Sequence, residues 1–466
     1  MAYIGKTPTI GNFQKCDAIS VVNGQAAYTL QVGGSNISPQ SENHMLVSLN
    51  GILQAPTDSF TVSGSTITFA SALSTGDVID FVMILGNVLD LGVPSDNTVS
   101  TAKISDSAIT PAKLGYDYNQ YRNIIINGDM SIAQRGTSQA SAGSGSGLYQ
   151  TVDRYKFLNN NLGVFTISQD TDVPSGQGFA KSLKLDCTSA DVSPASGDYL
   201  LIQVNTEGQN LQYLKKGTTN AQSLTLSFWV KAVKTGTFIV DLVDVDNNRT
   251  ISQSYTINSA STWEKKTLTF AGDTTGAFGN DNGKSLECNF WLGAGTDFTS
   301  GTLQTSWGTQ VSANRVVGQV NLADSTDNEW YITGVQLEAG TTASDFEFLP
   351  YDVNLRRCQR YYFLKGSGAN QDIAVANYYT TSDIRASVAF PVTMRAVPSI
   401  DVTAVSNGYT IRRNGGEDNL DDFTINNPSL TSTQIINSSD VSGTAGQAGL
   451  LFTDNSGCFL AFTSEL

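Results

Sequence analysis

The sequence has little charge and almost no histidine. Charged residues make up 15% of the 466 residues, and His44 is the only histidine; an ordinary soluble domain carries about 25% charged residues. A histidine-based catalytic or metal site is therefore confined to one position. His44 precedes an expected strand, and we expect a structural role for it. No GxSxG or HExxH motif occurs, which excludes those serine-hydrolase and zinc-protease signatures.

Cysteine and long apolar runs are also scarce. The five cysteines are far apart and form no CxxC pair; this pattern predicts free thiols in a protein made in a reducing cytoplasm. The longest apolar stretch, residues 78–93, is interrupted by Asp80 and Asp90, whereas a membrane span needs about 20 apolar residues. The start of the chain lacks the charged and apolar regions of a secretion signal. We therefore expect no membrane insertion.

Basic charge is the third shortage. The chain has 27 Lys and Arg against 42 Asp and Glu, a net charge of -15. Nucleic-acid binding requires a basic stripe that neutralises phosphates. The densest basic group, Arg356, Arg357 and Arg360, is local and lies among aromatic residues. The composition therefore argues against a nucleic-acid partner and indicates a solvated acidic surface.

The residues that are abundant indicate β-structure. Hydrophobic residues reach 40%, there are 43 glycines, and helical periodicity is rare. Regularly spaced Phe, Tyr, Val and Ile argue against disorder. The length predicts about three domains. The sequence thus predicts an all-β chain of serial antiparallel sandwich or jelly-roll domains.

Turn signals divide residues 15–90 into short strands. Asn23-Gly24 and Asn50-Gly51 separate strand-like runs, and Asn-Gly favours a hairpin because both turn positions need positive φ. We expect a small antiparallel sandwich. The expected strand pairs are 18–22 with 26–30, 45–49 with 52–54, and 60–62 with 66–69, followed by a last strand over 78–85.

A short imperfect repeat follows. The sequence VSTAKI at 99–104 recurs ten residues later as ITPAKL at 109–114. So small a unit cannot bury its own apolar side chains and is stable only when something packs against it. Two further copies of the same chain would supply that packing, which predicts a homotrimer. The apolar residues expected at the three-fold axis of this neck are Val99, Ile104, Ile109 and Leu114.

Period-two alternation dominates the rest of the chain. In LTLSFWVKA (224–232) and SLECNFWLG (285–293), every second residue is apolar, which is typical of half-buried strands. The last 100 or so residues are again rich in strand patterns, including alternation over 384–390. We expect one larger β-domain over 119–355 and another over 356–466.

Several of these segments resemble bacteriophage proteins. The run LNGILQAPTDSFTVSGSTITFASALSTGDVIDFVMILG is similar to the N-terminal modules of tail fibres from podovirus-like phages, and the repeat resembles their neck repeats. The segments FWVKA, TWEKKTLTF and EWYITGVQLEAG resemble jelly rolls of the carbohydrate-binding-module type in phage fibres. The resemblance implies a virion-attachment domain at 1–92, a trimeric neck at 93–118, a carbohydrate-binding-like jelly roll at 119–355 and a receptor-binding tip at 356–466.

Two sets of residues are candidates for glycan or receptor contacts. Three tryptophans lie opposite the apolar faces of their strands, where they can stack on a sugar; packing beneath a loop or against a neighbouring chain is the favoured alternative. The tip mixes aromatics with donors, although ordinary exposed strand residues explain that mixture too. The candidates are Trp229, Trp263, Trp291, Tyr378, Tyr379, Arg385, Tyr409, Arg412 and Arg413.

Metal and catalytic signatures are incomplete. Residues 244–248 (DVDNN) begin like a calcium loop, but Arg249 replaces the required Gly and Tyr255 the required Glu. A polar hairpin turn is the better interpretation, although a structural Ca²⁺ bound by distant segments stays possible. No carboxylate pair lies in a recognisable glycosidase motif. We expect no cofactor and no enzymatic activity.

These observations predict a phage tail fibre that is made in the host cytoplasm and becomes part of the virion. It would dock on a tail or adaptor protein through its N-terminus and bind a host surface glycan or an outer-membrane protein. Three weak sites held together would bind with avidity. The alternatives are a tailspike-like polysaccharide depolymerase and a structural adaptor or head fibre that never contacts a receptor.

Overall fold

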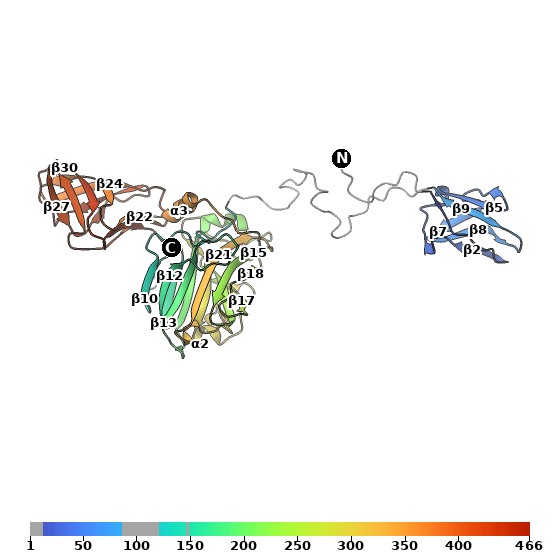
Figure 1. Cartoon of the computed structure of the whole chain (residues 1–466), viewed down its shortest axis with the longest axis horizontal. Coiled ribbons are helices and arrows are strands. Elements are labelled where there is room, and N and C mark those ends of the chain that lie inside the picture. Colours follow the sequence, from blue (N-terminus) through green and yellow to red (C-terminus); the bar gives the residue numbers. More distant parts are fainter. Residues whose placement is uncertain (1–12, 86–120, 146–148) are drawn as a thin grey trace. The chain divides into compact units, whose positions relative to one another are not determined.

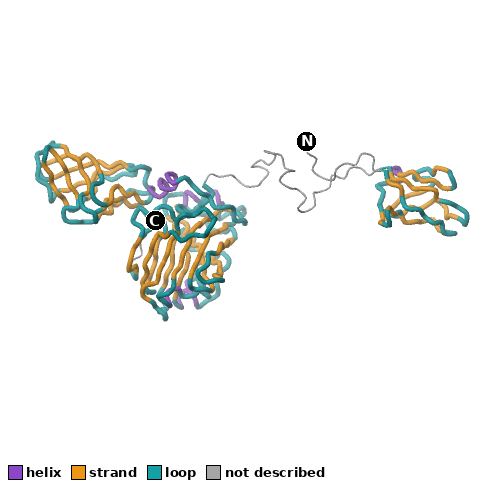
Figure 2. The backbone as a smooth tube through the Cα atoms, in the orientation of Figure 1, coloured by secondary structure: helices purple, strands orange, loops and turns teal. Residues whose placement is uncertain are grey.

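The computed structural model describes residues 13–85, 121–145 and 149–466. The chain divides into two compact units, Met1–Tyr118 and Asn119–Leu466 (Figure 1). Strands dominate both units and helices are few (Figure 2). The model is mostly β-sheet with several antiparallel sheets, which confirms the all-β expectation. The neck residues Val99, Ile104, Ile109 and Leu114 lie outside the described residues.

Unit 1 is a small sandwich of antiparallel sheets. One sheet has the order β1-β9-β5-β6, a second has the order β2-β8-β7, and β3 pairs with β4. Apolar residues of both larger sheets share one core, including Val47, Phe60 and Val82. The elements are β1 (Gln14–Lys15), β2 (Gln25–Thr29), β3 (Gln31–Val32), β4 (Ser35–Asn36), η1 (Glu42–His44), β5 (Met45–Leu49), β6 (Ile52–Leu53), β7 (Phe60–Ser63), β8 (Thr66–Leu73) and β9 (Ile79–Ile84).

The hairpin predictions in unit 1 are mostly confirmed. Strands β5 and β6 flank Asn50-Gly51, whose φ angles of 54° and 77° fit the expected turn. Strands β7 and β8 form the third hairpin. The first prediction is wrong, because residues 18–22 form no strand and β2 pairs instead with β8. Long-range pairing therefore overrides the local Asn-Gly signal at position 23.

Unit 2 begins with a sandwich of two six-stranded antiparallel sheets. Their orders are β10-β12-β13-β21-β15-β18 and β11-β14-β19-β16-β17-β20. The first contains β10 (Ser138–Ala142), β12 (Val164–Asp170), β13 (Ser182–Ser189), β15 (Leu224–Ala232), β18 (Glu264–Phe270) and β21 (Glu329–Ala339). The second contains β11 (Lys156–Asn160), β14 (Tyr199–Glu207), β16 (Gly236–Asp244), β17 (Arg249–Ile257), β19 (Lys284–Ala294) and β20 (Gly308–Thr309).

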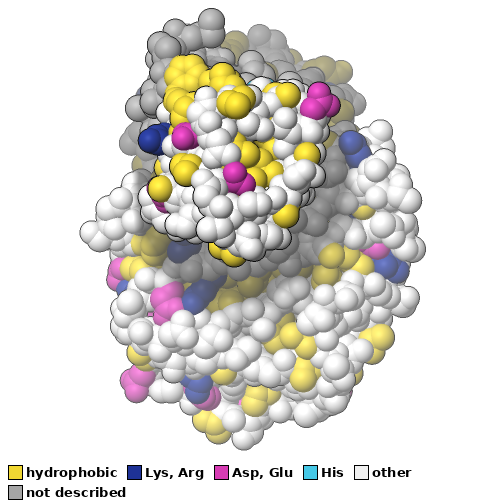
Figure 3. All heavy atoms as spheres, turned by 90° about the vertical axis from the view of Figure 1, so that its right-hand side faces the viewer, with side chains coloured by type: hydrophobic (Ala, Val, Ile, Leu, Met, Phe, Trp, Pro, Cys, Tyr) yellow, Lys and Arg dark blue, Asp and Glu magenta, His cyan; other side chains and the backbone are white. Residues whose placement is uncertain are grey.

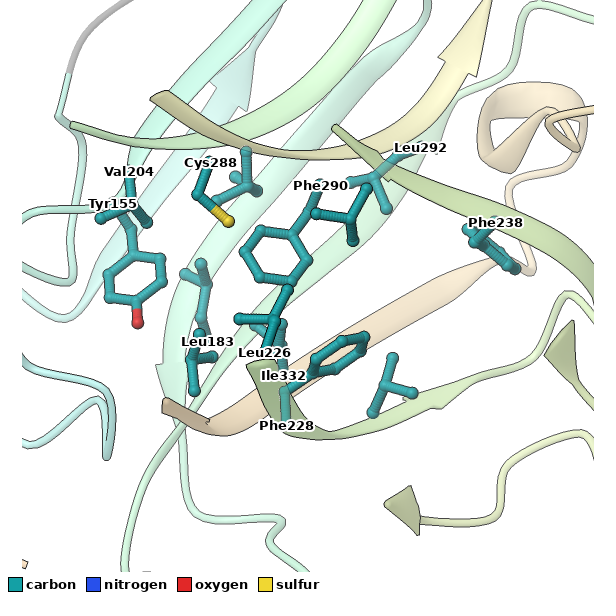
Figure 4. Packing of buried hydrophobic residues seen from close by; sticks show 14 of the residues in the cluster. Tyr155, Leu183, Val204, Leu226, Phe228, Phe238, Cys288, Phe290, Leu292 and Ile332 are labelled. Atoms are coloured by element: carbon teal, nitrogen blue, oxygen red, sulfur yellow. The ribbon is translucent and has the colours of Figure 1, made fainter. Parts of the chain in front are cut away.

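The apolar faces of these two sheets meet in one continuous core (Figure 4). Strand β15 covers the predicted segment 224–232, and its Leu226 and Phe228 are fully buried. Phe290 of β19 meets Phe228 edge to face, with ring centroids 5.3 Å apart. Such aromatic pairs add to the stability that their buried area provides. The alternation predicted for both strands is confirmed.

A second β-region follows α3 (Tyr351–Gln359) and has its own core, including Tyr378, Ile411 and Phe462. It combines a three-stranded sheet, β22-β31-β25, with a seven-stranded sheet, β27-β26-β30-β23-β24-β29-β28. The strands are β22 (Tyr362–Ser367), β23 (Asp372–Thr380), β24 (Asp383–Ala389), β25 (Ser399–Val402), β26 (Tyr409–Arg413), β27 (Gly416–Leu420), β28 (Thr424–Asn426), β29 (Ser432–Asn437), β30 (Ala448–Thr453) and β31 (Phe459–Thr463).

Short helices occupy the loops of the sandwich that begins unit 2, which is called the first sandwich below. They are η3 (Gly208–Asn210), η4 (Gln212–Leu214), α2 (Thr296–Thr299), η5 (Ser312–Asn314) and η6 (Leu322–Asp324). In the described part of the chain, no helix is long and apolar enough to cross a membrane. All five cysteines are buried and free, as expected. In the space-filling view, uncharged polar and backbone atoms cover most of the visible described surface, and charged side chains form isolated spots (Figure 3).

Candidate functional site

A cavity of about 670 Å³ lies in unit 2. It is bordered by the end of β14, by α3, and by residues 121–126, which precede α3 by more than 200 residues in the sequence. This volume falls in the range of about 300–1,000 Å³ that is usual for ligand pockets. Its lining residues come from five separate segments of the chain. They are Tyr121, Asn123, Ile124, Ile126, Arg154, Asn205, Thr206, Gln209, Asn210, Tyr213, Val353, Arg356, Arg357, Arg360, Tyr361, Val392 and Thr393.

Helix α3 supplies Arg356 and Arg357 of the cavity, and Arg360 follows its last residue. Pro350 occupies the N-cap position with a φ of -52°, and Asp352 lies in the first turn. Arg356 and Arg357 lie in the last turn, where positive charge interacts favourably with the helix dipole. The sequence thus places basic residues at the end of the helix that borders the cavity.

Arg360 is neutralised by a buried carboxylate. Its Nε and Nη2 donate to the two Oε atoms of Glu207 at 2.8 and 2.7 Å, and the Tyr361 hydroxyl also donates to Glu207. Glu207 is fully buried. Burial by itself raises the pKa of Glu207, but the hydrogen bonds from Arg360 and Tyr361 outweigh it, so the pKa lies below its usual value. This group holds the first sandwich against the C-terminal β-region.

Arg154 is the second neutralised guanidinium. It forms an ion pair with Glu465, its Nη2 donates to the carbonyl of Asn205 at 2.8 Å, and it lies 3.5 Å from the centre of the Tyr361 ring. Burial works to lower the pKa of Arg154, but Glu465 outweighs that effect and keeps the pKa above its usual value. Arg154 therefore serves as a structural cation at the base of the cavity.

Arg356 and Arg357 differ from these two. Among the described residues, neither guanidinium forms an ion pair. Arg357 donates to the carbonyl of Asn123 at 3.3 Å and lies 5.3 Å from the centre of the Tyr121 ring. Burial lowers the pKa of Arg357. The cavity therefore contains two positive charges that no carboxylate of the described residues meets in an ion pair, although Glu347 acts on Arg357 at longer range.

Two of the predicted contacts at the tip are wrong. Tyr378 and Tyr409 are fully buried in the core of the C-terminal β-region. The Tyr378 hydroxyl donates to Asp418, and that of Tyr409 donates to the carbonyl of Phe459 at 2.6 Å. Period-two alternation explains the error, because Tyr378 shares the inward face of β23 with Ala376. Neither residue can contact a glycan without unfolding.

The other tip candidates are accessible but partnered. Tyr379 is 60% exposed, and Arg385 lies 3.8 Å from the centre of its ring. Each arginine pairs with a carboxylate close in sequence. The pairs are Arg385 with Asp383 at 2.9 Å, Arg412 with Glu417 at 2.5 Å and Arg413 with Asp418 at 2.7 Å. Their role in receptor binding stays a prediction.

The three tryptophans lie in different settings. Trp291 is buried, donates to Asp241 at 3.0 Å and packs against Phe298 of α2. Its assignment as a glycan contact is therefore wrong, and packing beneath a loop, the favoured alternative, is confirmed for this residue. Trp229 and Trp263 are half-buried. Trp263 donates to Asp172 at 2.9 Å, and both stay candidates for a second contact surface.

An internal lysine occupies the region of the calcium-like loop. The ammonium group of Lys216 pairs with Asp244 and, at 3.0 Å, with Asp273. It also donates to the carbonyls of Thr275 and Gly276 at 2.9 and 2.8 Å. These oxygens therefore surround a side-chain cation. No group of three or more His, Cys, Asp or Glu residues in the described ranges is arranged to hold a metal ion.

The chain is similar to solved structures of a phage tailspike domain and of carbohydrate-binding modules. No protein-family model matches the chain, and no curated protein matches it. Similar solved structures include the enzymatically active domain of tailspike protein 4 from bacteriophage CBA120, at 16% identity over 47% of this chain and 22% of that one, with a TM-score of 0.25. The match therefore spans less than a quarter of the tailspike's length.

Carbohydrate-binding modules also appear among the similar structures. A CBM4 module matches at 11% identity over 46% of this chain and 99% of that one, with a TM-score of 0.24. A family 11 module from Clostridium thermocellum, in complex with a mixed-linked tetrasaccharide, matches at 10% identity over 45% and 99%, with a TM-score of 0.22.

The cavity was not predicted from the sequence, where Arg356, Arg357 and Arg360 stood out only as a basic cluster too small to bind nucleic acid. The available signal was the position of these arginines at and just after the end of a short helix that begins after Pro350. Tyr121 lies more than 200 residues from the cluster and Glu207 lies 153 residues from Arg360, so sequence proximity does not reveal these partners.

Proposed function

We propose that this chain is a non-enzymatic bacteriophage tail fibre that attaches a virion to its host by binding a surface polysaccharide. The observation that carries the proposal is the cavity of about 670 Å³, which combines exposed tyrosine rings with guanidinium groups that lack carboxylate partners. Aromatic rings provide flat apolar surfaces and arginines provide directed donors. This combination suits a ligand with hydroxyl groups and flat ring faces.

Assignment to a virion is supported by the sequence resemblance to tail fibres and by the serial β-domains. The segment 1–92 would dock on a tail or adaptor protein, and unit 2 would present the cavity to the cell. Deleting residues 1–90 should leave a soluble protein that no longer enters virions. Normal incorporation of the truncated chain would show that attachment occurs elsewhere.

Trimerisation would multiply weak sites. Three copies held together bind with avidity, since the second and third contacts become intramolecular. Native mass measurement should therefore give three chains, and a monomer at micromolar concentration would contradict the proposal. Ile109→Asp should weaken assembly because three unpaired charges would meet near one axis.

Binding to purified bacterial surface polysaccharides tests the function itself. We expect the full chain to bind a subset of them without generating new reducing ends. Release of reducing ends would instead support the tailspike-like depolymerase. Imaging of virions labelled at the C-terminus addresses the remaining alternative, because a structural adaptor or head fibre would never contact the cell surface.

A further inference from the structure

The arginines that line the cavity differ in whether they have a carboxylate partner. Of its four arginines, Arg154 and Arg360 have buried carboxylate partners. Arg356 and Arg357 have none among the described residues, although they share a short helix with each other. Two adjacent guanidinium groups repel each other, and removing one from water without a counter-ion costs free energy. A ligand with negative charge would offset that cost.

Among the described residues, Glu347 forms no ion pair with Arg356 or Arg357. Glu347 influences Arg357 electrostatically, but both of its carboxylate oxygens accept backbone N–H groups, from Tyr121 and from Asn123, each at 3.0 Å. Its hydrogen bonds therefore position the segment that bears Tyr121. Within the described residues, Arg357 makes one hydrogen bond, to the carbonyl of Asn123 at 3.3 Å. Most of its five donors stay available.

Aromatic faces complete the site. Tyr121 and Tyr213 line the cavity and are 49% and 40% exposed. A partly exposed ring can cover the apolar face of a pyranose, while its hydroxyl reaches water or the ligand. Bidentate guanidinium groups match the planar geometry of a carboxylate better than lysine does. The lining thus offers separate contacts for a ring face and for an acidic group.

We infer that the cavity binds an acidic sugar residue of the polysaccharide, whose carboxylate is held by Arg356 and Arg357. The inference rests on the proposed function, because it names the ligand class of that site. A phosphate on a sugar presents a similar oxyanion, so the probes must separate the two sources. The overall charge of -15 repels acidic polymers at long range, so recognition depends on these close contacts.

The test uses the full chain and an immobilised panel of bacterial polysaccharides. The panel contains uronic-acid polymers, sialic-acid polymers, phosphate-bearing polymers and neutral polymers. We expect binding to carboxylate-bearing members and at least tenfold weaker binding to neutral ones. The double variant R356Q/R357Q should lose at least tenfold in affinity for the bound members. The matched control K234Q/K284Q removes the same charge from two surface ion pairs of unit 2 whose lysines do not line the cavity, and it should bind as the parent does.

Each outcome decides the inference. Equal binding by R356Q/R357Q, or a bound set made up of neutral or phosphate-bearing polymers, would overturn it. Failure to bind any acidic polymer would overturn it too. If R356Q/R357Q still binds polysaccharides and infects normally, the proposed function stands and only the site assignment fails. If acidic sugars bind in the cavity but virions lack the protein, the proposed function fails and the site assignment stands. Unchanged thermal unfolding of R356Q/R357Q would show that loss of binding is not loss of fold.

Discussion

The arginines of the C-terminal sheet and those of α3 have the same side chain in opposite electrostatic settings. Arg385, Arg412 and Arg413 each pair with a carboxylate two to five residues away. Arg356 and Arg357 form no ion pair within the described residues and line a cavity. Both segments mix arginine with tyrosine, so composition does not distinguish them. The partners that the fold supplies decide which guanidinium groups can meet a ligand.

A third setting lies between these two. Arg154 and Arg360 line the same cavity as Arg356 and Arg357, but their buried partners Glu465 and Glu207 commit them to structure. The arginines of one cavity therefore have different roles. Arg154 and Arg360 stabilise the fold, whereas Arg356 and Arg357 stay available to a ligand. Mutations of the paired groups should change stability, whereas mutations of the unpaired groups should change binding.

The largest effect should follow from breaking a buried pair. Glu207→Gln leaves Arg360 and Tyr361 without their carboxylate, and removal of one partner of a buried ion pair costs about 3–5 kcal/mol. Chemical denaturation of the full chain should show this loss in the transition of unit 2. Glu417→Gln is the matched control, because its pair with Arg412 is exposed and is worth at most about 1 kcal/mol. Equal losses in the two variants would remove the distinction between buried and exposed pairs.

A pH titration should reveal a further buried charge near Arg135. Burial raises the pKa of Asp153 to about 6, and Arg135 and Gln134 counteract this only in part. Since the folded pKa exceeds the unfolded value of about 3.9, the folded state binds this proton more tightly. The free energy of unfolding should therefore fall by about 2 kcal/mol as the pH rises from about 4 to about 6.

Asp153→Asn provides the control for that titration. The variant has no proton to release, so its stability should stay level across the same pH window. Below about pH 4 both proteins should lose stability, because carboxylates such as Glu207 have folded pKa values below their usual range. A slope of the same size in both proteins would assign the effect to another group.

The smallest stability effect should have the opposite sign. Arg357→Met removes a partly buried charge that has no carboxylate partner, so we expect a gain of up to about 1 kcal/mol in the free energy of unfolding. Arg360 directly follows the same helix and is paired with Glu207. Arg360→Met removes this paired charge and should therefore destabilise the protein. A destabilised Arg357→Met variant would show that Arg357 serves the fold.

Strands were the most predictable part of the molecule. The pattern of β15 and β19 follows directly from period-two alternation, because each strand has one face in the shared core. The hairpin at Asn50-Gly51 was predictable for a local reason, the two positive φ angles. The absence of a strand at 18–22 was not predictable, because β2 pairs with β8, which begins more than 40 residues after this segment.

The candidate site was much less predictable. Residue types alone suggested Tyr378 and Tyr409 as contacts, and only the strand register shows that both point into the core. The cavity is built from segments around residues 121, 154, 207, 356 and 393. No local pattern joins such distant segments, since their meeting is fixed by the packing of α3 on the first sandwich. Charge partners were equally hidden until the ion pairs were known.

Hydrogen–deuterium exchange on the full chain, with and without a bound acidic polysaccharide, tests the central claim most directly. We expect the ligand to slow exchange at residues 205–213 and 351–361, which border the cavity, and to leave residues 376–385 and 409–413 unchanged. Protection confined to these latter segments would contradict the account, because it would assign recognition to the paired arginines of the C-terminal sheet.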